Sequence, residues 1–144
     1  MMSAVPYKVL VLDDSPTALR MTQALLGRVG FDVVALDSAV HFFKSLEREK
    51  PDVVLVDVSM PVIDGGSVVA MSRKAQTHRC PVLLYSDRPD RELAALASQH
   101  GADGYVRKSN DASVLKTAIL QAMVKGKARP SFTPPPKPGG LIPE

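Results

Sequence analysis

Apolar residues of this chain fall into five short runs. Each run is followed by a longer stretch in which apolar residues recur at helical spacing. Short apolar runs that are rich in valine and leucine and bounded by turn-forming residues predict buried strands. The expected strands cover residues 7–12, 31–36, 52–57, 81–86 and 104–107. The periodic stretches that follow them are typical of amphipathic helices.

Helix start and stop signals support the same division of the chain. Ser15 before Pro16 marks the start of the first helix, Gly30 ends it, and Gly101 ends a later one. The polar Thr22 interrupts the apolar face of the first helix. The five helices are expected to begin at or near Ser15, Ser38, Asp64 or Gly66, Pro89, and Asn110 or Asp111. The expected buried face of the helix after Pro89 consists of Leu93, Ala94, Leu96 and Ala97.

Strands that alternate with helices predict an α/β fold, here a doubly wound five-stranded parallel sheet with five helices covering both faces. In such sheets, functional sites form at the carboxyl ends of the strands. We expect residues 1–125 to form this domain and residues 126–144 to be a Pro-rich basic tail that is extended or disordered. Its segment 134–138 fits polyproline II, which either binds an aromatic groove or stays solvated.

Composition and charge exclude several classes of protein. Of 144 residues, 45% are hydrophobic and 23% are charged, as in ordinary globular domains. The net charge of +3 arises beyond residue 124, since residues 1–124 carry equal numbers of basic and acidic residues. We therefore expect no direct nucleic-acid binding. Without a membrane-length apolar run or a signal-like N-terminus, we expect a cytoplasmic protein with no membrane insertion. The single cysteine, Cys80, excludes an internal disulfide.

Polar side chains end or follow four of the five expected strands. Asp13 and Asp14 follow the first strand, and Asp57, Ser86 and Lys108 occupy the ends of three others. The carboxyl ends of parallel strands converge on one edge, where three carboxylates would repel one another and favour a shared cation. Carboxylate ligands suit Mg²⁺ or Mn²⁺ rather than zinc. With a lysine and a hydroxyl nearby, these groups indicate a phosphoryl site.

From about residue 6 to residue 125, the chain resembles the receiver domains of two-component response regulators, whose fold is flavodoxin-like. The matching residues occur in the family's order along the chain: Asp13, Asp14, Asp57, Met60, Pro61, Asp64, Gly65, Ser86, Tyr105 and Lys108. The resemblance implies a stand-alone, chemotaxis-regulator-like phosphoacceptor, since residues 126–144 are too few for an output domain.

The resemblance implies a phosphoacceptor site built around Asp57. This aspartate would take a phosphoryl group from a sensor histidine kinase or a phosphotransfer protein and form an acyl phosphate. Asp13 and Asp14 would hold Mg²⁺ together with Asp57 and the backbone carbonyl of Ser59. Self-catalysed phosphotransfer and dephosphorylation would be the only chemistry, so we do not expect an enzyme that acts on a separate substrate.

The resemblance also implies how the signal would leave the site. Lys108 would pair with one phosphoryl oxygen, and Ser86 would donate to another and move inward. Tyr105 would then rotate to a buried position and remodel the surface formed by the fourth helix, the fifth strand and the fifth helix. An unknown downstream protein would bind that surface, or the phosphoryl group would pass on in a relay. We expect a monomer or a weak dimer.

Two positions beside the site depart from the family pattern. Ser109 follows Lys108 where the family usually has a proline joined by a cis peptide, a bond that costs about 2.5–4 kcal/mol before other residues. Asp87 follows Ser86 where the family usually has alanine or glycine, and its carboxylate would either narrow access to Asp57 or oppose an incoming phosphodonor. We expect altered rates rather than loss of the reaction.

Three alternatives remain open from the sequence. Asp87 and Ser109 motivate a receiver-like scaffold that signals without phosphorylation. The same carboxylates would serve a Mg²⁺-dependent phosphohydrolase, although no insertion is long enough for a substrate cap. A flavin-binding module fits less well, because the acidic edge would repel a phosphate-bearing cofactor. Some matching residues also have plain structural explanations: Asp13 and Asp14 suit a helix start, and Tyr105 suits a strand.

Overall fold

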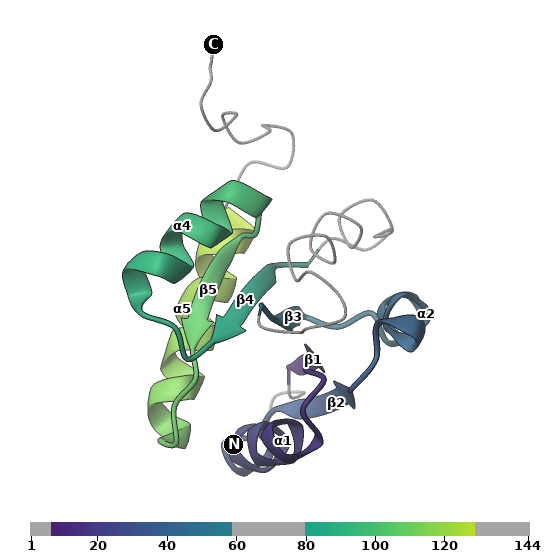
Figure 1. Ribbon diagram of the computed structural model, residues 1–144. Coiled ribbons are helices and arrows are strands. Elements are labelled where there is room, and N and C mark those ends of the chain that lie inside the picture. The colour runs from purple at the N-terminus through teal and green to yellow at the C-terminus, as the bar shows by residue number, and fades with distance from the viewer. Residues whose placement is uncertain (1–6, 59–79, 129–144) are drawn as a thin grey trace.

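The structure is a computed structural model that describes residues 7–58 and 80–128 (Figure 1). A five-stranded sheet lies at its centre and comprises β1 (Lys8–Leu12), β2 (Asp32–Leu36), β3 (Val53–Asp57), β4 (Val82–Ser86) and β5 (Gly104–Arg107). The strand order is β2-β1-β3-β4-β5, and every pairing is parallel. The doubly wound parallel sheet predicted from the sequence is therefore confirmed.

Within the described residues, the helices are α1 (Pro16–Arg28), α2 (Ala39–Glu49), α4 (Asp90–His100) and α5 (Ala112–Ala128). α1 and α5 cover one face of the sheet, while α2 and α4 cover the other (Figure 1). The helix expected to begin near Asp64 or Gly66 lies outside the described residues. α5 continues past residue 125, where we expected the domain to end, and residues 129–144 of the expected tail also lie outside the described part. No described helix has the length and apolar character needed to cross a membrane.

Helix ends follow the local signals in the sequence. Ser15 Oγ accepts the Ala18 backbone N–H at 3.2 Å and caps α1. Asp111 Oδ1 accepts two backbone N–H groups in the first turn of α5, at 2.9 and 3.3 Å. Gly30 follows α1 with φ +101°, and Gly101 ends α4 with φ +76°. Glycine adopts this left-handed conformation without steric strain, so both positions end their helices as predicted.

The central strands are buried on both faces. In β1, Val9 and Val11 pack towards α1 and α5, whereas Leu10 and Leu12 pack towards α2 and α4. The same alternation in β3 and β4 gives two apolar layers, one on each side of the sheet. This burial makes the sheet a rigid support for the residues at the strand ends.

The buried face of α4 is narrower than we predicted. Leu93 and Ala97 are buried, and Leu96 packs partly against the same core. Ala94 is exposed, so the prediction that it would be buried was wrong. Ala94 lies about 100° around the helix from Leu93, which places it at the margin of the apolar face.

The strand order brings the polar strand ends together. In the strand order, β2 lies beside β1 towards one edge of the sheet, and β4 lies beside β3 towards the other edge. The order along the chain therefore reverses between β1 and β3, which flank the switch point of the doubly wound fold. Leu12 pairs with Val56, and the next residues, Asp13 and Asp57, therefore stand side by side. On the other side of β3, the Lys108 backbone N–H donates to the carbonyl oxygen of Ser86 at 2.8 Å.

Candidate functional site

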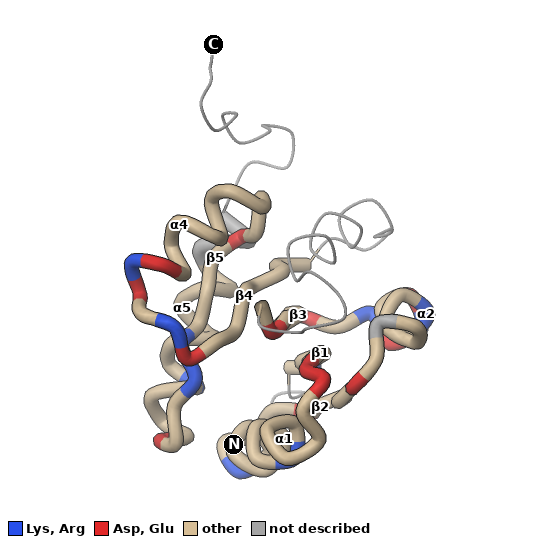
Figure 2. Tube along the Cα trace, in the orientation of Figure 1, with Lys and Arg blue, Asp and Glu red and all other residues tan. Residues whose placement is uncertain are grey.

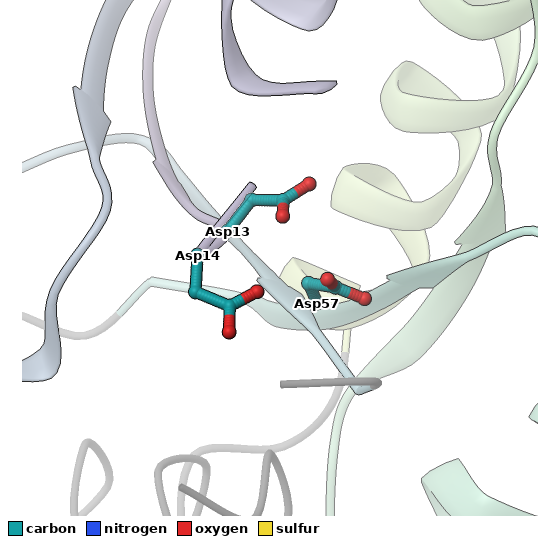
Figure 3. A group of neighbouring side chains, drawn as sticks. All are labelled: Asp13, Asp14 and Asp57. Carbon is teal, nitrogen blue, oxygen red and sulfur yellow. The ribbon is translucent and has the colours of Figure 1, made fainter. Parts of the chain in front are cut away.

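Three aspartates meet at the carboxyl ends of β1 and β3 (Figure 3). Asp13 and Asp14 follow β1, Asp57 ends β3, and one carboxylate oxygen from each lies within 4.8 Å of the others. Asp13 and Asp57 are buried, while Asp14 is partly exposed. Figure 2 shows the same concentration of acidic positions at the ends of these two strands. Negative charges this close repel one another and favour a bound cation.

The chemistry of this cluster fits a magnesium ion. Oxygen ligands of an octahedral Mg²⁺ lie about 2.9–4.2 Å from one another, because each is about 2.0–2.1 Å from the metal. Small side-chain rotations would bring Asp13, Asp14 and Asp57 into that range from their present separation of up to 4.8 Å. All three donors are hard oxygens, which favours Mg²⁺ or Mn²⁺ over zinc. Ser59, whose backbone carbonyl we predicted as a further ligand, lies outside the described residues.

Lys108 supplies positive charge to the aspartate cluster. Its Nζ atom donates to Asp13 Oδ2 at 3.1 Å, and the two side chains are 25% and 1% exposed, respectively. Partial burial lowers the pKa of Lys108, but the hydrogen bond to Asp13 and the charge of Asp57 outweigh it. The pKa therefore lies above its ordinary value, and the ammonium group stays protonated at neutral pH.

Thr22 and Tyr85 also belong to this site, although we did not predict them as site residues. Lys108 Nζ lies over the Tyr85 ring, 5.2 Å from its centroid. Tyr85 Oη and Thr22 Oγ1 of α1 are hydrogen-bonded at 2.9 Å, and both side chains are buried. Burial raises the pKa of Tyr85, and the hydrogen bond with Thr22 offsets this only in part. Two features of the sequence could have indicated them: Thr22 is a polar residue in the apolar face of its helix, and Tyr85 is a tyrosine in a mostly aliphatic strand.

Ser86 and the two unusual positions lie at the ends of β4 and β5. Ser86 is buried, and its Oγ accepts the Arg88 backbone N–H at 3.2 Å. Every peptide bond among the described residues is trans, including the one between Lys108 and Ser109. Ser109 Oγ accepts the Asp111 backbone N–H at 3.0 Å, so Ser109 shapes the turn that leads into α5.

A pocket of about 330 Å³ opens beside these residues, between α1 and the loops after β4 and β5. Its lining residues are Ala18, Met21, Thr22, Leu25, Tyr85, Asp87, Lys108, Ser109 and Asn110. Both unusual positions, Asp87 and Ser109, therefore lie on its wall. Tyr105, the residue we predicted to act as a switch, lies on the other face of the sheet, partly buried against the core beneath α2 and α4.

Comparisons with known proteins agree with this architecture. Residues 9–120 match the family model of the response regulator receiver domain. The chain is 31% identical to Protein PilG of Pseudomonas aeruginosa, over 88% of this chain and 90% of that protein. It is 35% identical to the transcriptional regulatory protein CseB of Streptomyces coelicolor, over 77% of this chain but 47% of that protein. The chain thus spans about half the length of the CseB-type relative.

Solved structures show the same likeness. A response regulator receiver domain protein from Clostridium thermocellum superposes with a TM-score of 0.70 at 30% identity, over 84% of this chain and 97% of that one. The chemotaxis response regulator CheY4 of Vibrio cholerae superposes with a TM-score of 0.70 at 24% identity, which supports the fold. The matched segment, residues 9–120, includes the three aspartates and Lys108. The chain therefore belongs to the response regulator receiver domain family of two-component signalling.

Proposed function

We propose that this chain is a phosphoacceptor whose Asp57 takes a phosphoryl group from a histidine kinase or a phosphotransfer protein. Receiver domains are signalling domains rather than conventional enzymes, they interact with such proteins, and they generally use Mg²⁺ at an acidic site. The observation that carries the proposal is the grouping of Asp57 with Asp13, Asp14 and Lys108 at one edge of the sheet.

The charges and acceptor at this edge of the sheet suit phosphoryl transfer. A carboxylate oxygen of Asp57 attacks the phosphorus, the bond from phosphorus to the donor histidine nitrogen breaks, and the imidazole leaves with a proton. A Mg²⁺ ion held by Asp13, Asp14 and Asp57 would neutralise charge on the transferred group. Lys108 provides a second positive charge next to the acceptor, and its raised pKa keeps it protonated. Because Asp57 ends a buried strand, the nucleophile is held in a fixed position.

Ser86 and Tyr105 are the proposed readout. Ser86 Oγ accepts a backbone N–H, and its own hydroxyl hydrogen can be donated to a phosphoryl oxygen. A phosphoryl group on Asp57 adds negative charge beside Ser86, which would draw this side chain inward. Tyr105 is partly buried in β5, and its rotation would change the surface of α4, β5 and α5 that a downstream protein binds.

Labelling with acetyl phosphate and Mg²⁺ tests the proposal. Intact-mass spectrometry should show one added phosphoryl group on the wild type and none on Asp57→Asn. Asp37→Asn is the matched control, because Asp37 is an exposed aspartate that follows β2. It should be labelled like the wild type. Equal labelling of the wild type and Asp57→Asn would reject Asp57 as the acceptor. A wild type without labelling would favour the phosphorylation-independent scaffold.

A further inference from the structure

Tyr85 contacts Lys108 but has no part in the phosphoryl transfer proposed above. The Lys108 ammonium lies 5.2 Å from the centre of the Tyr85 ring, which is within the range of about 6 Å for a cation–π contact. Tyr85 pairs with Asp57 in the register of β4 and β3, and it directly precedes Ser86. The ring therefore lies next to the acceptor and beneath the ammonium group of Lys108.

The Tyr85 ring is a fixed surface. Its side chain is 1% exposed and packs in the core between the sheet and the helices α1 and α5. Thr22, itself 4% exposed, joins its hydroxyl to that of Tyr85 at 2.9 Å. Packing restrains one end of the ring and this hydrogen bond restrains the other. A lysine side chain has many rotamers, so a fixed partner lowers the entropic cost of holding its ammonium in one place.

Asp13, which also contacts Lys108, has competing partners. Asp13 Oδ1 accepts the Ser15 backbone N–H at 3.0 Å, while Oδ2 accepts from Lys108 at 3.1 Å. The same carboxylate belongs to the cluster that fits a divalent cation. When Asp13 also binds a divalent cation, the positive charge of that cation weakens the attraction between Asp13 and Lys108. The neutral Tyr85 ring has no such competitor.

The pocket beside the site gives the Lys108 side chain space in which to change its position. Lys108, Tyr85 and Thr22 all line this pocket of about 330 Å³. Without the ring, the charges of Asp13 and Asp57 would still attract the ammonium group, but the side chain would have more freedom to turn into the pocket. We propose that Tyr85, whose ring is packed in the core, is a positioning residue that keeps the Lys108 ammonium beside Asp57. Tyr85 can have this effect on the reaction only if Asp57 and Lys108 act as described above, so the inference rests on the proposed function.

A nuclear magnetic resonance measurement tests the contact without any phosphorylation. The ε-methylene signal of Lys108, assigned by comparison with Lys108→Arg, should be shifted upfield by the ring in the wild type, both with and without Mg²⁺. Tyr85→Phe keeps the ring and should keep the shift, whereas Tyr85→Leu should lose it. An unshifted Lys108 signal in the wild type would overturn the proposal, even if Tyr85→Leu failed to fold.

The rate of phosphorylation by acetyl phosphate gives the second readout. Tyr85→Leu should react about three- to tenfold more slowly, as expected for loss of a cation–π contact, while Tyr85→Phe should stay close to the wild type. Phe42→Leu is the matched control, because Phe42 is fully buried on the opposite face of the sheet. Unchanged rates in Tyr85→Leu, or equal slowing in Phe42→Leu, would overturn the proposal. If the wild type shows no labelling that depends on Asp57, the proposed function is refuted. The Lys108 signal then still decides, independently, whether Tyr85 holds the ammonium group.

Discussion

The hydrogen bond between Thr22 and Tyr85 is a direct link between α1 and the site, and its strength can be measured. Its two hydroxyl groups are 2.9 Å apart, and their side chains are 4% and 1% exposed. Thr22→Val and Tyr85→Phe each remove one hydroxyl and keep the shape of the side chain. The double variant removes both hydroxyls, so the three variants and the wild type form a double-mutant cycle.

Each single variant leaves one buried hydroxyl group without its partner. Such a loss costs about 1–3 kcal/mol of unfolding free energy. We expect about 2 kcal/mol for Thr22→Val, because the Tyr85 hydroxyl is held in the core. We expect about 1 kcal/mol for Tyr85→Phe, because a threonine in a helix can turn its hydroxyl to a carbonyl of the preceding turn. The double variant leaves no unpaired hydroxyl, so its loss should be smaller than the sum of the single losses by about 2 kcal/mol.

Urea unfolding at 25 °C measures these differences. With a slope of about 1–3 kcal/mol per molar urea for small domains, a loss of 2 kcal/mol shifts the midpoint by about 1 M. Both single variants should therefore unfold at lower urea than the wild type. The double variant should lose about 1 kcal/mol, so its midpoint should lie above that of Thr22→Val and close to that of Tyr85→Phe. Losses that add within about 0.5 kcal/mol would show that the two hydroxyl groups do not interact, because independent sites behave that way.

Three further predictions concern the same described residues. Mg²⁺ at ten times its Kd should raise the unfolding free energy of the wild type, measured with urea, by about 1.4 kcal/mol. The gain for Asp14→Asn should be much smaller, and an equal gain would contradict the metal site. Because the pKa of Lys108 is raised in the folded state, its contribution to stability is complete below the ordinary value of 10.5 and is lost as pH rises through the folded-state pKa. Lys108→Met should flatten the alkaline decline of unfolding free energy, and an equally steep decline would argue against the pair with Asp13. Asp111→Ala should lower the unfolding free energy by about 0.5–2 kcal/mol through loss of the α5 cap. Asp111→Asn, which keeps an acceptor oxygen, should lose much less, and equal losses would exclude the cap.

Much of the fold was predictable because its signals are local. The run Val53–Asp57 contains only apolar residues before its final aspartate, and a strand that is buried on both faces needs that pattern. Ser15 before Pro16 is enough to start a helix, and the structure shows the expected cap. Ala94 was placed wrongly because an alanine beside an apolar stripe carries little information about which side of the stripe faces the core.

The positions of the polar strand ends were predictable for a different reason. In a doubly wound sheet, the carboxyl ends of the strands share one edge, so Asp13 and Asp57 had to be neighbours once their strands were adjacent. The part played by Tyr85 and Thr22 was not predictable in this way. Their hydrogen bond joins residues that are 63 positions apart, and it depends on how α1 packs on the sheet. Only the tertiary structure shows that the tyrosine ring lies beneath Lys108.

Chemical mapping of the phosphorylated residue distinguishes Asp57, the proposed acceptor, from the neighbouring aspartates. Borohydride reduces an aspartyl phosphate to homoserine and releases phosphate, so it marks the residue that was phosphorylated. After treatment with acetyl phosphate and Mg²⁺ followed by reduction, peptide mass spectrometry should find homoserine at position 57. Aspartate should remain at positions 13 and 14. Homoserine at either of those positions, with Asp57 unchanged, would show that Asp57 is not the acceptor.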